Sequence, residues 1–288
     1  MGCDGCELRV PGSETNHCYA ADLVRRWAGS KGYPKSFDKP ELFAGRIEAA
    51  CRWRDLTGTT RPDKPWLNGM PRLIFMNDLS DPFSPSVDSE AWLTPALPAI
   101  ASSPHIWLLL TKRPTVALSY WRAHAIPRNV WPGVSITGPA SLRRIDYLAQ
   151  MDAPVRFVSI EPLIDRVDVA EGLRCCPDCL KPPREECGGS MHGGLRRVDW
   201  VILGGESGSN ARPMQPEWAQ SVRDQCVASN VPFFFKQWGE WLPGDQDGAV
   251  TAQGQALNCA NEPIRLGKHA AGRLLDGRQW NEMPEVRS

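Results

Sequence analysis

The stretch Trp200-Val201-Ile202-Leu203-Gly204-Gly205-Glu206-Ser207 decides the fold, because a short apolar run ends abruptly at glycine and polar residues. Five further runs of the same form are 73–76, 107–110, 130–136, 155–160 and 231–235. Short apolar runs are typical of buried parallel strands, whose carboxyl ends deliver polar groups to one active site. The repeat therefore predicts an α/β enzyme.

Segments with helical spacing lie between these runs. Pro40 and Pro216 precede apolar residues at four-residue steps, which places Cys51 and Cys226 on core faces. Another helix is expected just after Cys18, with Trp27 facing inward. Alternation of strand and helix predicts repeated βα units with right-handed crossovers. About six units predict a partial, incomplete TIM-type βα barrel of parallel strands; a doubly wound sheet is the alternative, because sequence spacing does not reveal strand order.

The chain divides into a main body and two less regular parts. We expect residues 1–241 to form the partial barrel with an N-terminal three-cysteine segment. Within it, residues 172–197 are rich in Cys, Pro and Gly and cannot build a core, so they are expected to be an insertion between two strands. Residues 242–288 are expected to form a C-terminal extension that packs on the barrel.

Composition limits the classes of partner and location. The 288 residues are 42% hydrophobic, and 33 Lys and Arg balance 33 Asp and Glu, so no net charge attracts nucleic acid or an acidic membrane. Nucleic acid remains a possible partner only through local basic patches on the surface. No apolar stretch approaches the roughly 18 residues of a membrane span, and the first residues lack the apolar core of a signal peptide. A cytoplasmic location is expected.

Three of the ten cysteines, Cys3, Cys6 and Cys18, lie in one short segment with glycines that allow it to turn. Three thiolates around a 4Fe–4S cluster leave one iron open for a substrate or S-adenosylmethionine. A zinc site or unrelated surface thiols are the alternatives. An open iron site implies catalysis.

Four further cysteines form a second group near His192. A tetrahedral zinc site is expected from Cys176, Cys179, Cys187 and His192, with Cys175 as an alternate ligand. A second cluster or an unliganded loop are the alternatives. A filled four-ligand zinc site would be structural.

Seven motifs along nearly the whole chain carry a family resemblance. They are Gly2-Cys3 with His17-Cys18-Tyr19-Ala20, and the segments 75–83, 110–114, 129–135, 159–163, 201–208 and 233–239. In these motifs the chain resembles the phage Gp37/Gp68 family. The resemblance implies a radical-SAM-like fold, with a three-cysteine motif ahead of a partial βα barrel, and a separately encoded three-Cys-motif partner protein. The spacing C-x2-C-x11-C differs from the tighter spacing of that family.

Polar residues at the strand ends are the candidate site. Glu161, Lys112 and Lys236 are the candidate catalytic residues. The candidate cofactor-binding residues are Asn77, Asp78, Ser135, Gly204, Gly205 and Glu206. Carboxylates would bind ribose hydroxyls or an ammonium group, lysines would bind a carboxylate or phosphate, and glycines would let backbone approach the adenine. Ion pairs that cap the barrel rim are the structural alternative for each charged residue.

Three functions fit this pattern. The first is a radical-SAM-like iron–sulfur enzyme that uses S-adenosylmethionine, with a nucleic acid or nucleotide as the suggested substrate. The second is a non-catalytic zinc-binding scaffold for a partner protein. The third is a barrel lyase or isomerase with acid–base residues and structural zinc.

Overall fold

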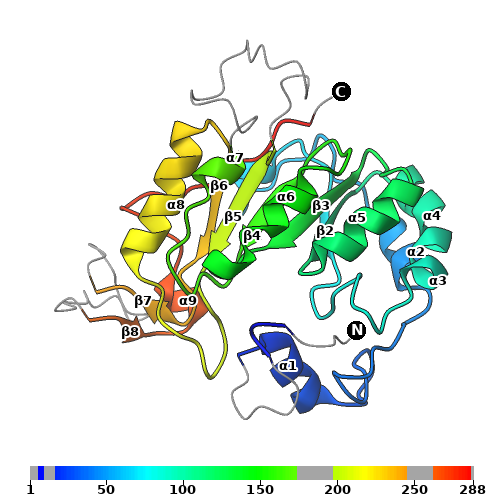
Figure 1. The fold of residues 1–288 in the computed structure, drawn as a ribbon, viewed down its shortest axis with the longest axis horizontal. Coiled ribbons are helices and arrows are strands. Elements are labelled where there is room, and N and C mark those ends of the chain that lie inside the picture. The colour runs from blue at the N-terminus through cyan, green and yellow to red at the C-terminus, as the bar shows by residue number, and fades with distance from the viewer. Residues whose placement is uncertain (1–5, 10–16, 174–196, 245–261, 287–288) are drawn as a thin grey trace. The chain divides into compact units, whose positions relative to one another are not determined.

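The computed structural model describes residues 6–9, 17–173, 197–244 and 262–286 (Figure 1). Six strands form one sheet in the order β1-β2-β3-β4-β5-β6. They are β1 Leu73–Met76, β2 Ile106–Thr111, β3 Val130–Ser135, β4 Phe157–Ile160, β5 Trp200–Gly204 and β6 Phe233–Gln237. The pairs β1–β2, β2–β3, β4–β5 and β5–β6 are parallel. The strand order follows the chain and never reverses, so the doubly wound alternative is excluded.

The chain divides into two compact units. Unit 1 consists of residues 1–134, 150–155 and 286–288, and unit 2 consists of residues 135–149 and 156–285. An α/β fold with six parallel strands is thus confirmed. The predicted division into a barrel of residues 1–241 and an extension of residues 242–288 is a different partition, and it stays a prediction.

Unit 1 contains β1, β2 and nearly all of β3. Its helices are α1 Tyr19–Trp27, α2 Arg46–Cys51, α3 Ser89–Trp92, α4 Leu97–Ser102 and α5 Pro114–Ala123, with 3-10 turns η1 Pro65–Leu67 and η2 Thr94–Ala96. Trp107 and Trp131 of β2 and β3 are fully buried, and α4 and α5 lie beside these strands (Figure 1). Asp88 caps α3 by accepting a hydrogen bond from the Ala91 N–H.

Unit 2 contains β4, β5 and β6, whose faces are packed with aromatic side chains. Phe157, Phe233, Phe235 and Trp238 are fully buried. The helices of this unit are α6 Arg144–Leu148, α7 Ala170–Leu173, α8 Pro216–Ala228 and α9 Lys268–Ala271, with the 3-10 turn η3 Pro139–Ser141. A small antiparallel pair is formed by β7 Trp241–Leu242 and β8 Ile264–Arg265.

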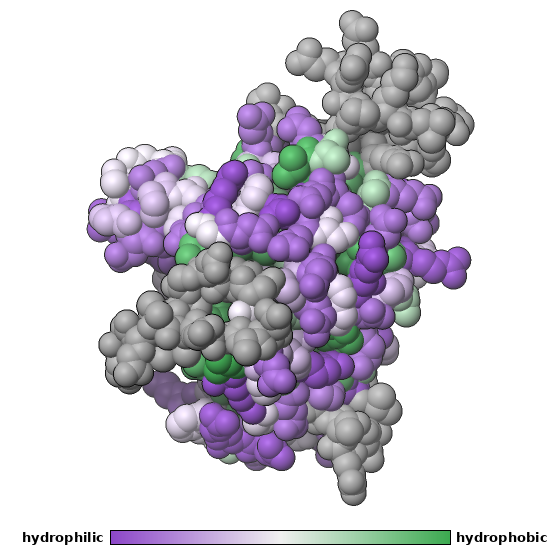
Figure 2. Space-filling model, turned by 90° about the vertical axis from the view of Figure 1, so that its left-hand side faces the viewer, coloured by the Kyte–Doolittle hydropathy of each residue, from purple (hydrophilic) through white to green (hydrophobic). Residues whose placement is uncertain are grey.

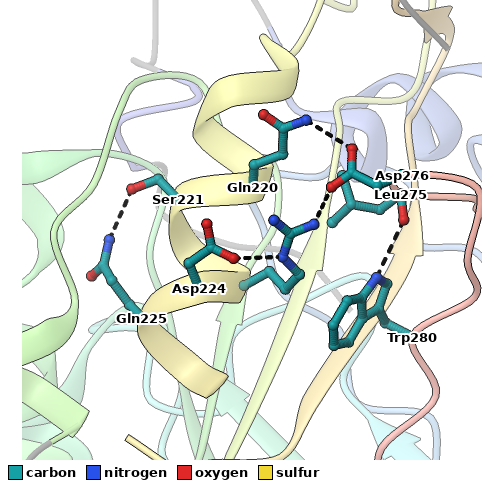
Figure 3. A network of polar contacts seen from close by, with 8 residues as sticks. Gln220, Ser221, Asp224, Gln225, Leu275, Asp276 and Trp280 are labelled. Carbon is teal, nitrogen blue, oxygen red and sulfur yellow. Dashed lines mark hydrogen bonds and ion pairs between the residues drawn. The ribbon is translucent and has the colours of Figure 1, made fainter. Parts of the chain in front are cut away.

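The end of the chain covers the outer edge of β6. The Phe235 N–H donates to the Trp280 carbonyl at 3.0 Å, and the Glu282 N–H donates to the Phe233 carbonyl at 3.2 Å. A polar network fixes the preceding residues to α8, where Arg223 and Gln220 both bind the Asp276 carboxylate (Figure 3). An otherwise open strand edge is thereby closed.

Two of the helix predictions need correction. Trp27, expected to face inward, is half exposed because it lies at the end of α1, beyond the buried residues Ala20, Ala21 and Val24. Cys51 is only partly buried. Cys226 is fully buried on α8, as expected, and burial strongly raises its pKa.

The surface is mainly polar on the face drawn in Figure 2. Hydrophobic residues there form small, separate patches between hydrophilic ones. Within the part of the chain that the structure describes, no helix combines the length and apolar content needed to cross a membrane.

Candidate functional site

Two of the three N-terminal cysteines lie close together in unit 1. Cys6 and Arg9 exchange backbone hydrogen bonds of 3.0 and 2.9 Å, which forms a tight turn, and the His17 N–H donates to the Leu8 carbonyl at 3.0 Å. This pairing brings Cys6 back towards Cys18, which directly precedes α1. Both thiols are partly buried. We call Cys6 and Cys18 the cysteine pair; Cys3 lies outside the described residues.

Backbone N–H groups lie near both sulfurs. The Leu8 N–H donates to Cys6 Sγ at 3.4 Å. Burial raises the pKa of the Cys18 thiol, while the N–H groups of Ala21 and Ala20 lower it, the charge of Cys6 raises it and the Lys112 ammonium lowers it. Hydrogen bonds to sulfur stabilise thiolate ligands of iron–sulfur clusters. Burial is the largest of these effects on Cys18, so its pKa is raised overall, and the nearby N–H groups and ammonium offset only part of that rise.

Tyr19 ties the cysteine pair to the turn after β1, and Asp81 ties that turn to the end of β2. The Tyr19 hydroxyl, next to Cys18, donates to the Asp78 carbonyl at 2.6 Å. The buried Asp81 carboxylate accepts from Thr111 Oγ1 and from the Lys112 N–H, both at 2.7 Å. These bonds fix the backbone of Lys112, whose ammonium acts on the Cys18 sulfur.

Asn77 has a backbone that few residues adopt. Its φ is 65°, in the left-handed region that asparagine tolerates better than most side chains. Its Nδ2 donates to Ser80 Oγ at 3.0 Å, and its buried Oδ1 has no partner among the described residues. The turn after β1 is thus built around Asn77.

A second polar group lies at the ends of β4, β5 and β6 in unit 2. Glu161 Oε2 is 2.9 Å from Lys236 Nζ, and Glu161 Oε1 accepts from Gln237 Nε2 at 3.2 Å. Gln237 Nε2 also donates to the Gly205 carbonyl at 2.9 Å. A Cβ added at Gly204 would lie 3.2 Å from Glu161 Oε1. We call Glu161, Lys236 and Gln237 the Glu–Lys–Gln group.

Glu206 is buried and paired. Its carboxylate accepts hydrogen bonds from Arg212 N, Nε and Nη2 at 2.8 to 2.9 Å. Its pairing with Arg212 matches the structural alternative of an ion pair; a role in cofactor binding stays a prediction. The loop after β5 and the loop after β6 approach closely at Gly205 and Gly239. A Cβ added at Gly205 would lie 1.9 Å from the Trp238 carbonyl oxygen, and one added at Gly239 would lie 2.2 Å from the Glu206 carbonyl oxygen.

The predicted site residues therefore fall into separate sets. Asn77, Asp78 and Lys112 belong to unit 1 with the cysteine pair, and Ser135, Glu161, 204–206 and Lys236 belong to unit 2. Ser135 is fully buried, and its carbonyl accepts from Arg144 Nη1 at 2.6 Å.

The expected zinc ligands Cys175, Cys176, Cys179, Cys187 and His192 lie outside the described residues. Among the residues that are described, no three His, Cys, Asp or Glu side chains gather as metal ligands. Neither metal site is tested by this finding, because both include residues beyond the described ranges.

Four residues of these groups were missed by sequence reasoning: Tyr19, Asp81, Arg212 and Gln237. Asp81 and Gln237 stand inside polar segments at strand ends, so the position of each segment was a usable signal. Tyr19 and Arg212 act through contacts that no spacing pattern reveals.

Comparison with protein-family models matches residues 2–284 to a family described as "Protein of unknown function (DUF5131)". The chain belongs to this family. Neither the curated proteins nor the solved structures gave a match. The residues that match the DUF5131 family model include most of both units, the cysteine pair and the Glu–Lys–Gln group. The resemblance to the phage Gp37/Gp68 family stays a prediction.

Proposed function

We propose that this chain is a radical-SAM-like iron–sulfur enzyme with a partial TIM-type fold. Its 4Fe–4S cluster would be held by Cys6 and Cys18, with Cys3 as the expected third ligand. The observation that carries the proposal is the cysteine pair. Eleven residues separate Cys6 from Cys18 in the sequence, yet the two thiols lie near enough for the charge of Cys6 to act on Cys18, and backbone N–H groups lie near both. Zinc alone would use such thiols too, so the metal must be measured.

The surroundings of the cysteine pair suit an anionic cluster. Clusters with thiolate ligands carry negative charge, which backbone N–H groups and a nearby ammonium stabilise. Leu8, Ala20 and Ala21 supply the N–H groups, and Lys112 supplies the positive charge. The residues present therefore fit the group.

The neighbouring side chains have positioning roles. Tyr19 ties the start of α1 to the turn after β1, and Asp81 fixes the backbone at Lys112. When bound, the cluster would supply the electron that cleaves S-adenosylmethionine, and an open iron would bind that cofactor. Asn77 and Asp78, in the turn that Tyr19 holds, are the residues of unit 1 proposed to contact the cofactor.

Metal analysis of protein purified without air tests the proposal. We expect about four irons and matching sulfide per chain, and release of 5′-deoxyadenosine from S-adenosylmethionine under dithionite. Cys6→Ala and Cys18→Ala should each lose the iron. Cys51→Ala is the matched control and should retain it, because Cys51 is another partly buried thiol and lies on α2.

A further variant separates the two expected metals. Cys179→Ala should keep the iron and lose any zinc, because Cys179 is assigned to the zinc site. Zinc without iron in the air-free protein, or iron retained in both Cys6→Ala and Cys18→Ala, would contradict the cluster assignment.

A second candidate function is acid–base catalysis at the Glu–Lys–Gln group. The ion pair of Glu161 with Lys236, at 2.9 Å and partly exposed, favours it. Paired acid and base groups of this kind serve lyases and isomerases. If the air-free protein lacks iron, this reading or the zinc scaffold takes precedence.

A further inference from the structure

One surface of unit 1 concentrates arginine around an exposed tryptophan. We call it the Arg–Trp surface: Arg52, Trp53, Arg54, Arg61 and Arg72, which lie between the end of α2 and the start of β1. Trp53 is 50% exposed. The sequence gives no hint of this gathering, because the arginines are spread over 21 residues of irregular chain.

Contacts hold Trp53, Arg61 and Arg72 in one group, and Arg52 and Arg54 flank Trp53 in the chain. The Arg72 guanidinium carbon lies 5.5 Å from the centre of the Trp53 ring, and Arg72 Nη2 donates to the Arg54 carbonyl at 3.4 Å. Arg61 Nη2 donates to the Pro71 carbonyl at 3.2 Å, next to Arg72. Burial and the nearby charge of Arg72 lower the pKa of Arg61. Two like charges are thus held close together.

The charges of this group are not neutralised by carboxylates. In the described part of the chain, none of its four arginines forms an ion pair, whereas Arg9, Arg156, Arg212 and Arg223 all do. Arg61 Nε and Arg72 Nε are buried without an acceptor among the described residues. The nearby Asp55 carboxylate binds Thr57 instead. A local positive surface therefore exists on a chain with no net charge.

An anion with planar rings matches this arrangement. Guanidinium groups bind phosphate oxygens through two parallel hydrogen bonds. An exposed indole ring stacks on an unpaired base, which a duplex does not present. A free phosphate would bind the arginines but would offer no ring to stack on Trp53.

We propose that the Arg–Trp surface binds single-stranded nucleic acid, with arginines on the phosphates and Trp53 on a base. This binding goes beyond the proposed function and requires no cluster, so either proposal can fail without the other.

Fluorescence anisotropy with the full chain tests the proposal. The probes are a labelled 20-nucleotide single strand of DNA, its RNA counterpart and the DNA duplex. We expect the single strands to bind more tightly than the duplex, and affinity to fall with salt. Arg52→Ala with Arg54→Ala should reduce the slope of log affinity against log salt by about 1.4, because each single-strand phosphate contact contributes about 0.7.

Matched variants separate the site from general effects. Trp53→Ala should weaken single-strand binding about fivefold or more. Trp27→Ala should leave it unchanged, although Trp27 has the same 50% exposure. Arg143→Ala with Arg166→Ala removes the same two charges from exposed positions of unit 2 and should also have no effect.

Three results would overturn the proposal: no binding to any probe, duplex bound as tightly as single strand, or equal loss in the Trp53 and Trp27 variants. Far-UV circular dichroism of each variant distinguishes lost binding from lost folding.

Discussion

Asp276 shows at the scale of single residues how charge fixes the end of the chain. Partial burial raises the pKa of its carboxyl, but hydrogen bonds from Arg223 and Gln220 outweigh burial, so the pKa is lowered below 3.8. A carboxyl with a lowered folded pKa stabilises the protein above its unfolded pKa, and that contribution is lost as pH falls through the folded value. The contact in Figure 3 should therefore depend on pH.

Asp276→Asn tests this dependence. The variant should be less stable at pH 7 by about 0.5 kcal/mol, because the Asp276 side chain is 41% exposed and water screens the pair. The difference should shrink towards pH 2, as the native carboxyl becomes protonated. Asparagine accepts the left-handed backbone at this position, where φ is 53°. Urea unfolding at both pH values measures the difference.

The matched control is Asp224→Asn. Asp224 also binds Arg223, but both residues lie on α8, so this pair does not join two segments. A difference for Asp276→Asn that is equal at both pH values would exclude the ionic origin.

Backbone contact between two loops is the main feature at the scale of elements. The loop after β5 and the loop after β6 bond through Gly205 N–H to the Gln237 carbonyl and Glu240 N–H to the Glu206 carbonyl, both at 2.9 Å. Backbone atoms approach so closely that a side chain at Gly205 has no room. These loops carry Glu206 and flank the Glu–Lys–Gln group.

Gly205→Ala should therefore destabilise the protein by about 3 kcal/mol, because the clash is with backbone that cannot rotate away. Gly138→Ala is the control: its Cβ would meet Asp165 Cβ at an ordinary 3.5 Å, in extended backbone. The control should change stability by less than about 1 kcal/mol. Urea unfolding measures both, and equal effects would show that the loops can move apart.

Charge balance is the property that belongs to the whole molecule. Thirty-three basic and 33 acidic residues leave no net charge at pH 7. Proteins near zero net charge associate most readily, because repulsion between copies is weakest. Binding to polyanions must then come from local surfaces, as proposed for the Arg–Trp surface.

Solubility at low salt should accordingly be lowest near pH 7 and rise towards about pH 9. Both double arginine variants should move the minimum to lower pH by the same amount, since each removes two positive charges. Light scattering across the pH range measures the minimum. Different shifts for the two variants would show that local surfaces, and not net charge, control association.

The six strands and several helices were determined by the sequence alone, because each depends on neighbours along the chain. The apolar run 73–76 is β1, and the helix predicted from Pro216 is α8. The helix predicted from Pro40 instead begins at Arg46, after Gly45 with φ of 79°. Local pattern sets the type of an element better than its first residue.

Only the tertiary structure decided the strand order and the pairing of side chains. Spacing placed Glu161, Lys236 and Glu206 at strand ends. It did not reveal that Glu161 forms an ion pair with Lys236 or that Glu206 forms one with Arg212. Such contacts join residues far apart in the chain, and their energy exists only once folding has brought them together. The pattern of buried strands depends on residues that are neighbours in the sequence, whereas the chemistry at the strand ends depends on contacts between residues far apart in the sequence.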